Sequence, residues 1–166
     1  YYFRTYIYAD NLPNVDTTII YLTNQTAPNI THVGVYIVLR TTGALALYDE
    51  DGQIGSDSST INVDQWYRIE LQYDRTPAAG SEIARAKIDG TEFAGSSSRS
   101  FSAGIRSFVV GSNLSAETAT SGNIYFDDIA INDSTGSFQT SYPGIGEIIH
   151  LRPNAVGDNE GWTGAG

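Results

Sequence analysis

The sequence predicts an all-β protein, folded as a two-sheet antiparallel sandwich of the jelly-roll type, and three observations support this prediction. Residues 67–73 alternate between apolar and polar, so Tyr67, Ile69 and Leu71 share one face, which is typical of a half-buried strand. Glycine and small polar residues are abundant, whereas lysine occurs once, and this composition favours strands and turns over helices. About ten to twelve short apolar runs are separated by turn residues without a helical period, which indicates two packed sheets.

Turn residues divide the chain into predicted strands. These strands are residues 1–8, 17–22, 33–40, 44–48, 53–55, 67–73, 84–88, 91–93, 105–111 and 123–132. The segments 33–40 and 44–48 are predicted to form a hairpin, and Asp89-Gly90 predicts a second, tight hairpin. The serine-rich stretch 95–100 is predicted to be exposed.

The strand at residues 67–73 is the one around which we expect a sheet to form. Its apolar face is expected in the core, while Arg68, Glu70 and Gln72 on the other face are expected in water. One buried face and one wet face are typical of a central strand in an antiparallel sheet. The sequence therefore predicts that this strand has neighbours on both sides.

The regular pattern ends after the last predicted strand. Gly136, Pro143 and Gly146 interrupt the remaining sequence, and the final residues are rich in glycine. A chain of 166 residues suffices for one domain with a sizeable core. We therefore predict one domain at residues 1–136 and a C-terminal extension, or linker to a following region, at residues 137–166.

Charge and composition argue against several classes of function. The formal net charge of −10 and the sequence pI of about 4.3 oppose nucleic-acid binding, which requires a basic surface. No apolar run approaches the roughly 20 residues of a membrane-spanning helix, so no membrane insertion is expected. The chain has no cysteine, and therefore no disulfide or thiolate metal site. The acidity favours solubility and is also compatible with divalent-cation binding.

The order of the motifs resembles the laminin-G-like domains, which belong to the concanavalin A-like jelly-roll class of lectins and glucanases. The motifs are the hairpin 34–48, the segment 64–71, the strand end 88–90 and the closing strand 125–131. The resemblance covers residues 1–132 and implies a concanavalin A-like sandwich.

A narrower resemblance lies near the C-terminus. Residues 124–136, followed by 142–144 and 146–154, look like structural proteins of tailed phages and prophages. In those proteins a laminin-G-like domain often precedes a second β-rich region. The resemblance implies a role on the virion surface, as a capsid decoration or tail-associated protein.

A stripe of large side chains runs along one face of the first predicted strand. Its members are Tyr2, Arg4, Tyr6 and Tyr8. Tyrosine and arginine are enriched at protein interfaces, and aromatic rings also stack on sugars and on partner side chains. The stripe is therefore a candidate binding surface, or else a second buried face that packs beneath a loop or neighbour. The pattern alone does not separate these alternatives.

Asp127 and Asp128 are adjacent in the last predicted strand, so strand alternation sends their carboxylates to opposite faces. This is a poor arrangement for a paired acid and base on one face, although a β-bulge could change it. We expect one of them to be half-buried near the 67–73 strand, satisfied by backbone N–H groups or an arginine. A calcium site at these residues is the alternative. The acidic segment 49–52 lacks the ligand spacing of an EF-hand and is expected to be a solvated turn.

No catalytic constellation is evident. The E-x-D-x-x-E strand motif of glucanases with this fold is absent, and His32 and His150 follow no metal or triad spacing. We therefore expect a protein that is not an enzyme, but a structural or adhesive module on an extracellular assembly, above all a phage virion. Its partners would be other copies of the chain or a protein shell, and its location the virion or the extracellular space. The alternative is a carbohydrate-binding module of a secreted protein, with calcium as the one candidate cofactor.

Overall fold

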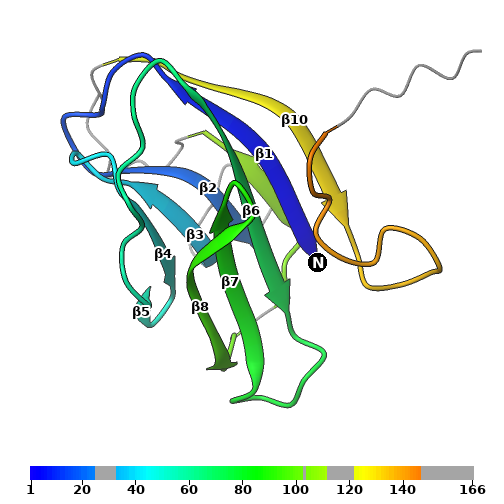
Figure 1. Cartoon of the computed structure of the whole chain (residues 1–166). Coiled ribbons are helices and arrows are strands. Elements are labelled where there is room, and N and C mark those ends of the chain that lie inside the picture. The colour runs from blue at the N-terminus through cyan, green and yellow to red at the C-terminus, as the bar shows by residue number, and fades with distance from the viewer. Residues whose placement is uncertain (25–32, 103, 112–121, 147–166) are drawn as a thin grey trace, which may run out of the picture.

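The computed structural model describes residues 1–24, 33–102, 104–111 and 122–146, and within them the chain forms ten strands and no helix. The strands are β1 (Tyr2–Ala9), β2 (Thr17–Thr23), β3 (Val33–Leu39), β4 (Leu45–Asp49), β5 (Gly52–Ile54), β6 (Trp66–Asp74), β7 (Glu82–Ile88), β8 (Thr91–Arg99), β9 (Ser107–Val110) and β10 (Ile124–Asn132). They build two antiparallel sheets of five strands each (Figure 1). The predicted all-β sandwich is confirmed. No helix long and apolar enough to cross a membrane occurs among the described residues.

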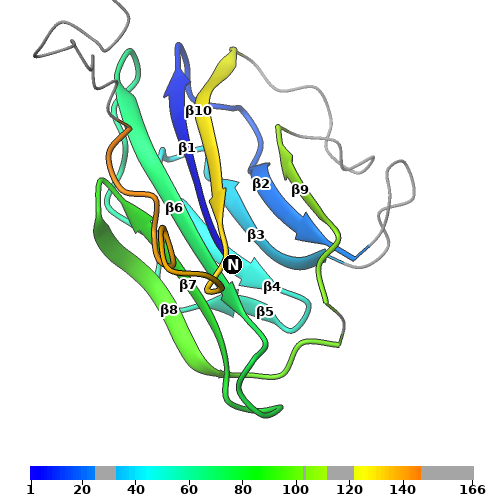
Figure 2. The same ribbon diagram turned by 90° about the vertical axis from the view of Figure 1, so that its right-hand side faces the viewer.

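The two sheets lie face to face, and β6 is central in one of them, as predicted. The first sheet, named the β1 sheet, has the order β10-β1-β6-β7-β8, and the β3 sheet has the order β5-β4-β3-β2-β9. Figure 2 shows the two layers. Both sheets contribute apolar side chains to the core between them, among them Phe3, Ile7, Ile37, Leu39, Leu45, Leu47, Ile69 and Leu71. The predicted apolar face of β6 is therefore the core face.

The hairpin between β7 and β8 turns at Asp89-Gly90, as predicted. Their φ angles of 50° and 87° are both positive, which is the requirement of a two-residue type I′ turn and explains the glycine. β8 is longer than predicted, because the serine-rich residues 95–99 continue to pair with β7. The predicted exposure holds for Ser97, Ser98 and Ser100, while the strand continues to Arg99 because backbone pairing with a neighbouring strand outweighs a weak strand propensity.

Two acidic side chains expected in water are buried. Glu70, on the predicted wet face of β6, is 2% exposed. Asp49 is 3% exposed and accepts hydrogen bonds from both Nε and Nη2 of Arg99, each at 2.6 Å. Arg99 ends β8 and Asp49 ends β4, so this pair connects the two sheets. In the same turn, Glu50 and Asp51 are exposed, as expected.

Toward the C-terminus the structure and the prediction differ in extent. β9 covers only the middle of the strand predicted at residues 105–111. Residues 147–166, which include the glycine-rich end of the sequence, lie outside the described residues. The division of the chain at residue 136 stays a prediction.

Candidate functional site

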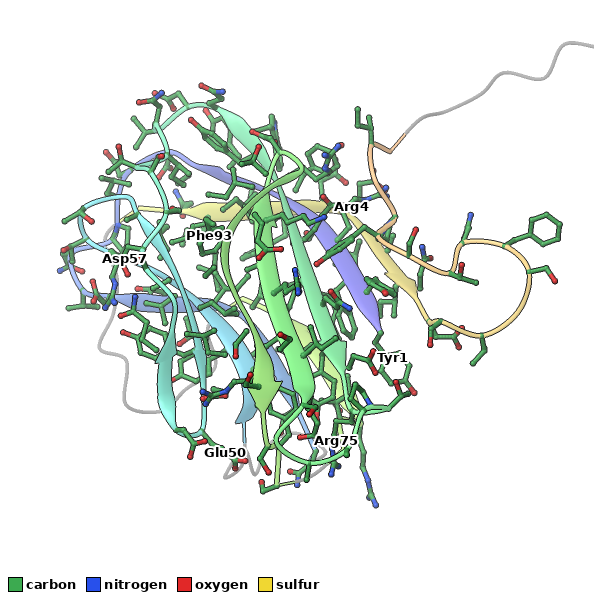
Figure 3. The ribbon with its side chains drawn as sticks, turned by 60° about the horizontal axis from the view of Figure 1, so that its bottom comes forward. Tyr1, Arg4, Glu50, Asp57, Arg75 and Phe93 are labelled. Carbon is green, nitrogen blue, oxygen red and sulfur yellow. The ribbon has the colours of Figure 1, made fainter. Side chains whose placement is uncertain are left out.

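A C-terminal segment covers part of the outer face of the β1 sheet, the face that points away from the β3 sheet. This segment, residues 141–146, is called the strap. The N–H of Gly144 donates to Glu70 Oε1 at 3.1 Å, and its carbonyl accepts from Arg4 Nη1 at 3.0 Å. Figure 2 shows the orange segment running over β6 and β7, and Figure 3 shows Arg4 beside it. The strap thus accounts for the burial of Glu70 and Arg4.

Tyr142 anchors the strap on the sheet. Its ring lies edge-on to the Tyr2 ring, with centroids 5.0 Å apart. The ammonium nitrogen of Lys87 lies 3.7 Å from the centre of the Tyr142 ring, within the range of a cation–π contact. Burial raises the pKa of the Tyr142 hydroxyl. One aromatic side chain therefore joins the strap to β1 and β7.

The strap divides the predicted stripe. Tyr2 contacts Tyr142, Arg4 donates to Gly144, and the Tyr6 hydroxyl accepts the N–H of Gly146 at 3.4 Å. For Tyr2, Arg4 and Tyr6 the structure shows a face packed beneath a loop, one of the two alternatives. Tyr8 lies outside the strap and belongs to a different cluster.

A bulge in β10 changes the predicted placement of Asp127 and Asp128. Tyr6 faces Asp127 while Arg4 faces Ala130, so β10 has one extra residue here, and Asp128 has a positive φ of 49°. The bulge directs Asp128 toward Arg4, with 2.7 Å between Oδ1 and Nη2. One carboxylate thus pairs with an arginine, as expected, but it remains 44% exposed. The bulge is the case in which strand alternation does not hold, and Asp127 and Asp128 line the same polar pocket as Arg4.

The surroundings of these carboxylates bear on the calcium alternative. Asp128 is paired with Arg4, and Asp127 Oδ1 accepts the N–H of Asp128 at 2.8 Å. The backbone of Gly146 lies so close to Asp128 that a Cβ at residue 146 would be 1.8 Å from Asp128 Oδ2. Within the described ranges, no group of three or more His, Cys, Asp or Glu side chains is placed to hold a metal ion. Calcium at Asp127 and Asp128 stays a prediction.

Three aromatic side chains form a continuous row on the outer face, at the end of the sheet where β1 finishes. Tyr8 faces Tyr125 of β10 on one side and Trp66 of β6 on the other. The Tyr8 centroid lies 5.4 Å from that of Trp66 and 5.8 Å from that of Tyr125. Trp66 is 46% exposed and Tyr125 is 50% exposed. We call Tyr125, Tyr8 and Trp66 the aromatic row.

Polar groups border the aromatic row. The Tyr8 hydroxyl donates to Asp64 Oδ1 at 2.9 Å, and this bond raises the pKa of Tyr8. Asp10 accepts the N–H of Asn123 at 2.6 Å and its side-chain Nδ2 at 2.7 Å, and these bonds lower the pKa of Asp10. The row and Asp10 line a shallow pocket of about 340 Å³. The site therefore combines an apolar ring surface with carboxylates, a typical composition for a small-ligand site.

Sequence reasoning named Tyr8 but missed Trp66 and Tyr125. Each precedes a core-facing aromatic residue, Tyr67 or Phe126, so alternation alone places both on the outer face. That signal was available. The sequence pattern did not indicate that β1 lies between β6 and β10 in the sheet. This strand order brings the three rings together.

The Tyr142→Ala variant is expected to release the strap while the sandwich stays folded. The ring contacts with Tyr2 and Lys87 are each worth about 0.5–1.5 kcal/mol. Hydrogen exchange should become faster at the strap amides, and thermal unfolding should remain cooperative. Phe138→Ala is the matched control, because this ring is 88% exposed and lies outside the strap. If both variants show the exchange pattern of the unmutated protein, Tyr142 does not anchor the strap.

Comparisons with known proteins show likeness in fold alone. No protein-family model matches the sequence, and no curated protein sequence matches it. The structure is similar to that of Trypanosoma rangeli sialidase in complex with sialic acid, with a TM-score of 0.57 and 13% identity over 77% of this chain and 20% of that chain. It is also similar to the same sialidase in complex with 2-keto-3-deoxy-D-glycero-D-galacto-2,3-difluoro-nononic acid, with a TM-score of 0.55 and 15% identity over 78% of this chain and 20% of that chain. This chain thus spans about a fifth of the length of the sialidase chains that it matches.

These comparisons correct one expectation. The sequence predicted a protein that is not an enzyme, yet the two solved structures described above, which have a similar fold, are of a sialidase, which is an enzyme. That expectation rested on the absence of known catalytic patterns, namely the glucanase motif and a metal or triad spacing of the histidines. Since an enzyme contains this fold without a close sequence relation to this chain, that argument was wrong.

Proposed function

We propose that the domain is a recognition module that binds glycans through the aromatic row. The observation that carries the proposal is the exposure of adjacent large rings, with Trp66 46% and Tyr125 50% exposed on either side of Tyr8. Rings of this size usually bury most of their surface. Each is held on a strand of the sandwich, so little conformational entropy is lost when a ligand stacks on them.

The chemistry of the row favours a sugar over other stacking ligands. A pyranose ring has apolar C–H faces that pack on aromatic rings, and hydroxyl groups that donate to carboxylates such as those of Asp10 and Asp64. Nucleic-acid bases also stack on aromatic rows, but a net charge of −10 repels their phosphates. The solved structures described above show that a similar fold occurs in a sialidase, which is a sugar-binding protein.

Trp66→Ala tests the proposal. Loss of one stacked ring is expected to weaken glycan binding about tenfold to a hundredfold, since such a contact is worth roughly 1–3 kcal/mol. A glycan array would identify a ligand, and titration calorimetry would measure its affinity for each variant. The control is Phe138→Ala, which removes an 88% exposed ring far from the row in sequence and should bind normally. Absence of any glycan ligand, or equal affinity of both variants, would overturn the proposal.

An adhesive role on an assembly is a second candidate, and one observation favours it. Ile129 and Ile131 are 50% and 53% exposed on β10, which is an edge strand. Exposed apolar side chains on an edge strand are typical of a protein contact. The resemblance to laminin-G-like domains and to phage structural proteins would place that contact on a virion. Light scattering on the same samples separates the two candidates, because assembly requires an oligomer and glycan binding does not.

A further inference from the structure

The border of the aromatic row is negatively charged. Asp10 lines the same pocket as the three rings. The Tyr8 hydroxyl donates to Oδ1 of Asp64, and this hydrogen bond does not involve Oδ2 of that carboxylate. The hydrogen bonds from Asn123 lower the pKa of Asp10, so this carboxylate stays ionised in weakly acidic solution. A ligand on the rings therefore lies next to carboxylates that retain hydrogen-bonding capacity.

The cationic side chains of the same sheet face are directed elsewhere. Arg68 Nε lies 3.3 Å from the buried Glu70 carboxylate. Arg4 is paired with Asp128, and Lys87 lies over the Tyr142 ring beneath the strap. Their charge is therefore compensated near the strap, whereas the carboxylates at the row face solvent.

Aromatic faces and carboxylates both attract cations. The face of a tryptophan or tyrosine ring carries a negative quadrupole, and a cation above it gains about 0.5–2 kcal/mol, depending on its exposure. A carboxylate near the ring adds a charge-assisted hydrogen bond to an ammonium group. The same surroundings repel an anionic sugar. A neutral acetamide group gains neither the cation–π contact nor the charge-assisted hydrogen bond.

We infer that the aromatic row selects sugars that carry a protonated amine, such as glucosamine residues with a free amino group, over N-acetylated or acidic sugars. The inference rests on the proposed glycan-binding function and specifies its ligand class. Stacking on Trp66 and Tyr125 would hold the sugar ring, and Asp10 and Asp64 would receive the ammonium group. Sialic acid, which the similar sialidase binds in its solved structure, would be disfavoured here because of its carboxylate.

Titration calorimetry with a chitin oligosaccharide and its fully deacetylated counterpart tests the inference. At about pH 5.5 the free amines are protonated, and the lowered pKa of Asp10 keeps that carboxylate ionised. The deacetylated form is expected to bind about tenfold tighter than the acetylated form, from one exposed cation–π contact and one carboxylate contact. A sialylated oligosaccharide, measured in the same buffer, should bind more weakly than either.

Asp64→Asn keeps the shape of the site and removes one charge. Asp64 has a positive φ of 58°, a conformation that asparagine tolerates well, so this variant should fold normally. Its preference for the deacetylated form should fall below tenfold, and that of Asp64→Asn combined with Asp10→Asn should fall to about threefold, which is the share of the remaining cation–π contact. Asp133→Asn removes the same charge at the other end of β10 and should keep the tenfold preference.

The outcomes separate this inference from the function on which it rests. Equal or tighter binding of the acetylated form overturns the inference and leaves the glycan-binding function intact. An equal loss of preference in Asp133→Asn and Asp64→Asn also overturns it, because general attraction to an acidic protein would then explain the result. If neither oligosaccharide nor any glycan on an array binds, both the function and the inference fail.

Discussion

The Asp49→Ala variant is expected to lose about 3 kcal/mol of its free energy of unfolding. The Asp49 carboxylate is 3% exposed and accepts two hydrogen bonds from Arg99, so the pair has the forked geometry of the stronger ion pairs. Removing the carboxylate leaves a guanidinium between the sheets without its main partner. The loss should lie at the lower end of the range for buried pairs, because Asp51 Oδ2 remains 3.3 Å from Arg99.

Urea denaturation of matched variants would measure this effect. Asp51→Ala removes a neighbouring carboxylate that contacts the same arginine but is 68% exposed, and it should cost less than about 1 kcal/mol. Combining Asp49→Ala with Arg99→Ala should cost less than the sum of the single changes, because no unpaired charge remains. A result in which Asp49→Ala is as mild as Asp51→Ala would show that this pair does not hold the sheets together.

Ile69→Ala is expected to destabilise the fold by about 2–5 kcal/mol. Ile69 is 1% exposed at the middle of β6, the central strand of its sheet, and it packs in the core between the layers. Truncation removes apolar contacts and leaves a cavity that the surrounding strands cannot fill without changing their register. Ile69→Val removes one methylene and should cost only about 0.5–1.5 kcal/mol.

Gln72, on the outer face of the same strand, provides a matched control for the effect of burial at Ile69. Gln72→Ala changes a side chain whose amide lies 3.4 Å from the Tyr2 hydroxyl, and it should cost less than about 1 kcal/mol. The denaturant concentration at the midpoint of unfolding should be highest for Gln72→Ala, lower for Ile69→Val and lowest for Ile69→Ala. If Gln72→Ala proves as damaging as Ile69→Ala, the two faces of β6 do not differ in burial.

The layers of the sandwich and the faces of its strands could be predicted from local patterns. Side chains alternate across any strand, so the positions of Ile37 and Leu39, or of Phe3 and Ile7, already indicate which face is buried. The turn at Asp89-Gly90 was equally predictable, because two consecutive positive φ angles restrict the residue types that fit. These features depend on neighbours in the sequence.

The candidate site was only partly predictable. Tyr8 was singled out within its stripe, but the aromatic row takes its other two rings from β6 and β10, which lie far from β1 in the sequence. The burial of Glu70 likewise depends on Gly144 of the strap, a contact that no local pattern indicates. The bulge at Asp128 also breaks the alternation on which the prediction for β10 relied.

Local patterns therefore sufficed for the fold class, the core-facing residues and the tight hairpin, because period-two alternation and turn geometry are properties of a few consecutive residues. The three-dimensional arrangement was needed to show which part of the stripe is covered and which rings meet. Strand order and register depend on packing between distant segments, and a shift by one residue would move every side chain to the other face. For that reason the covered half at Arg4 and the exposed row at Tyr8 look alike in the sequence but have different surroundings in the folded protein.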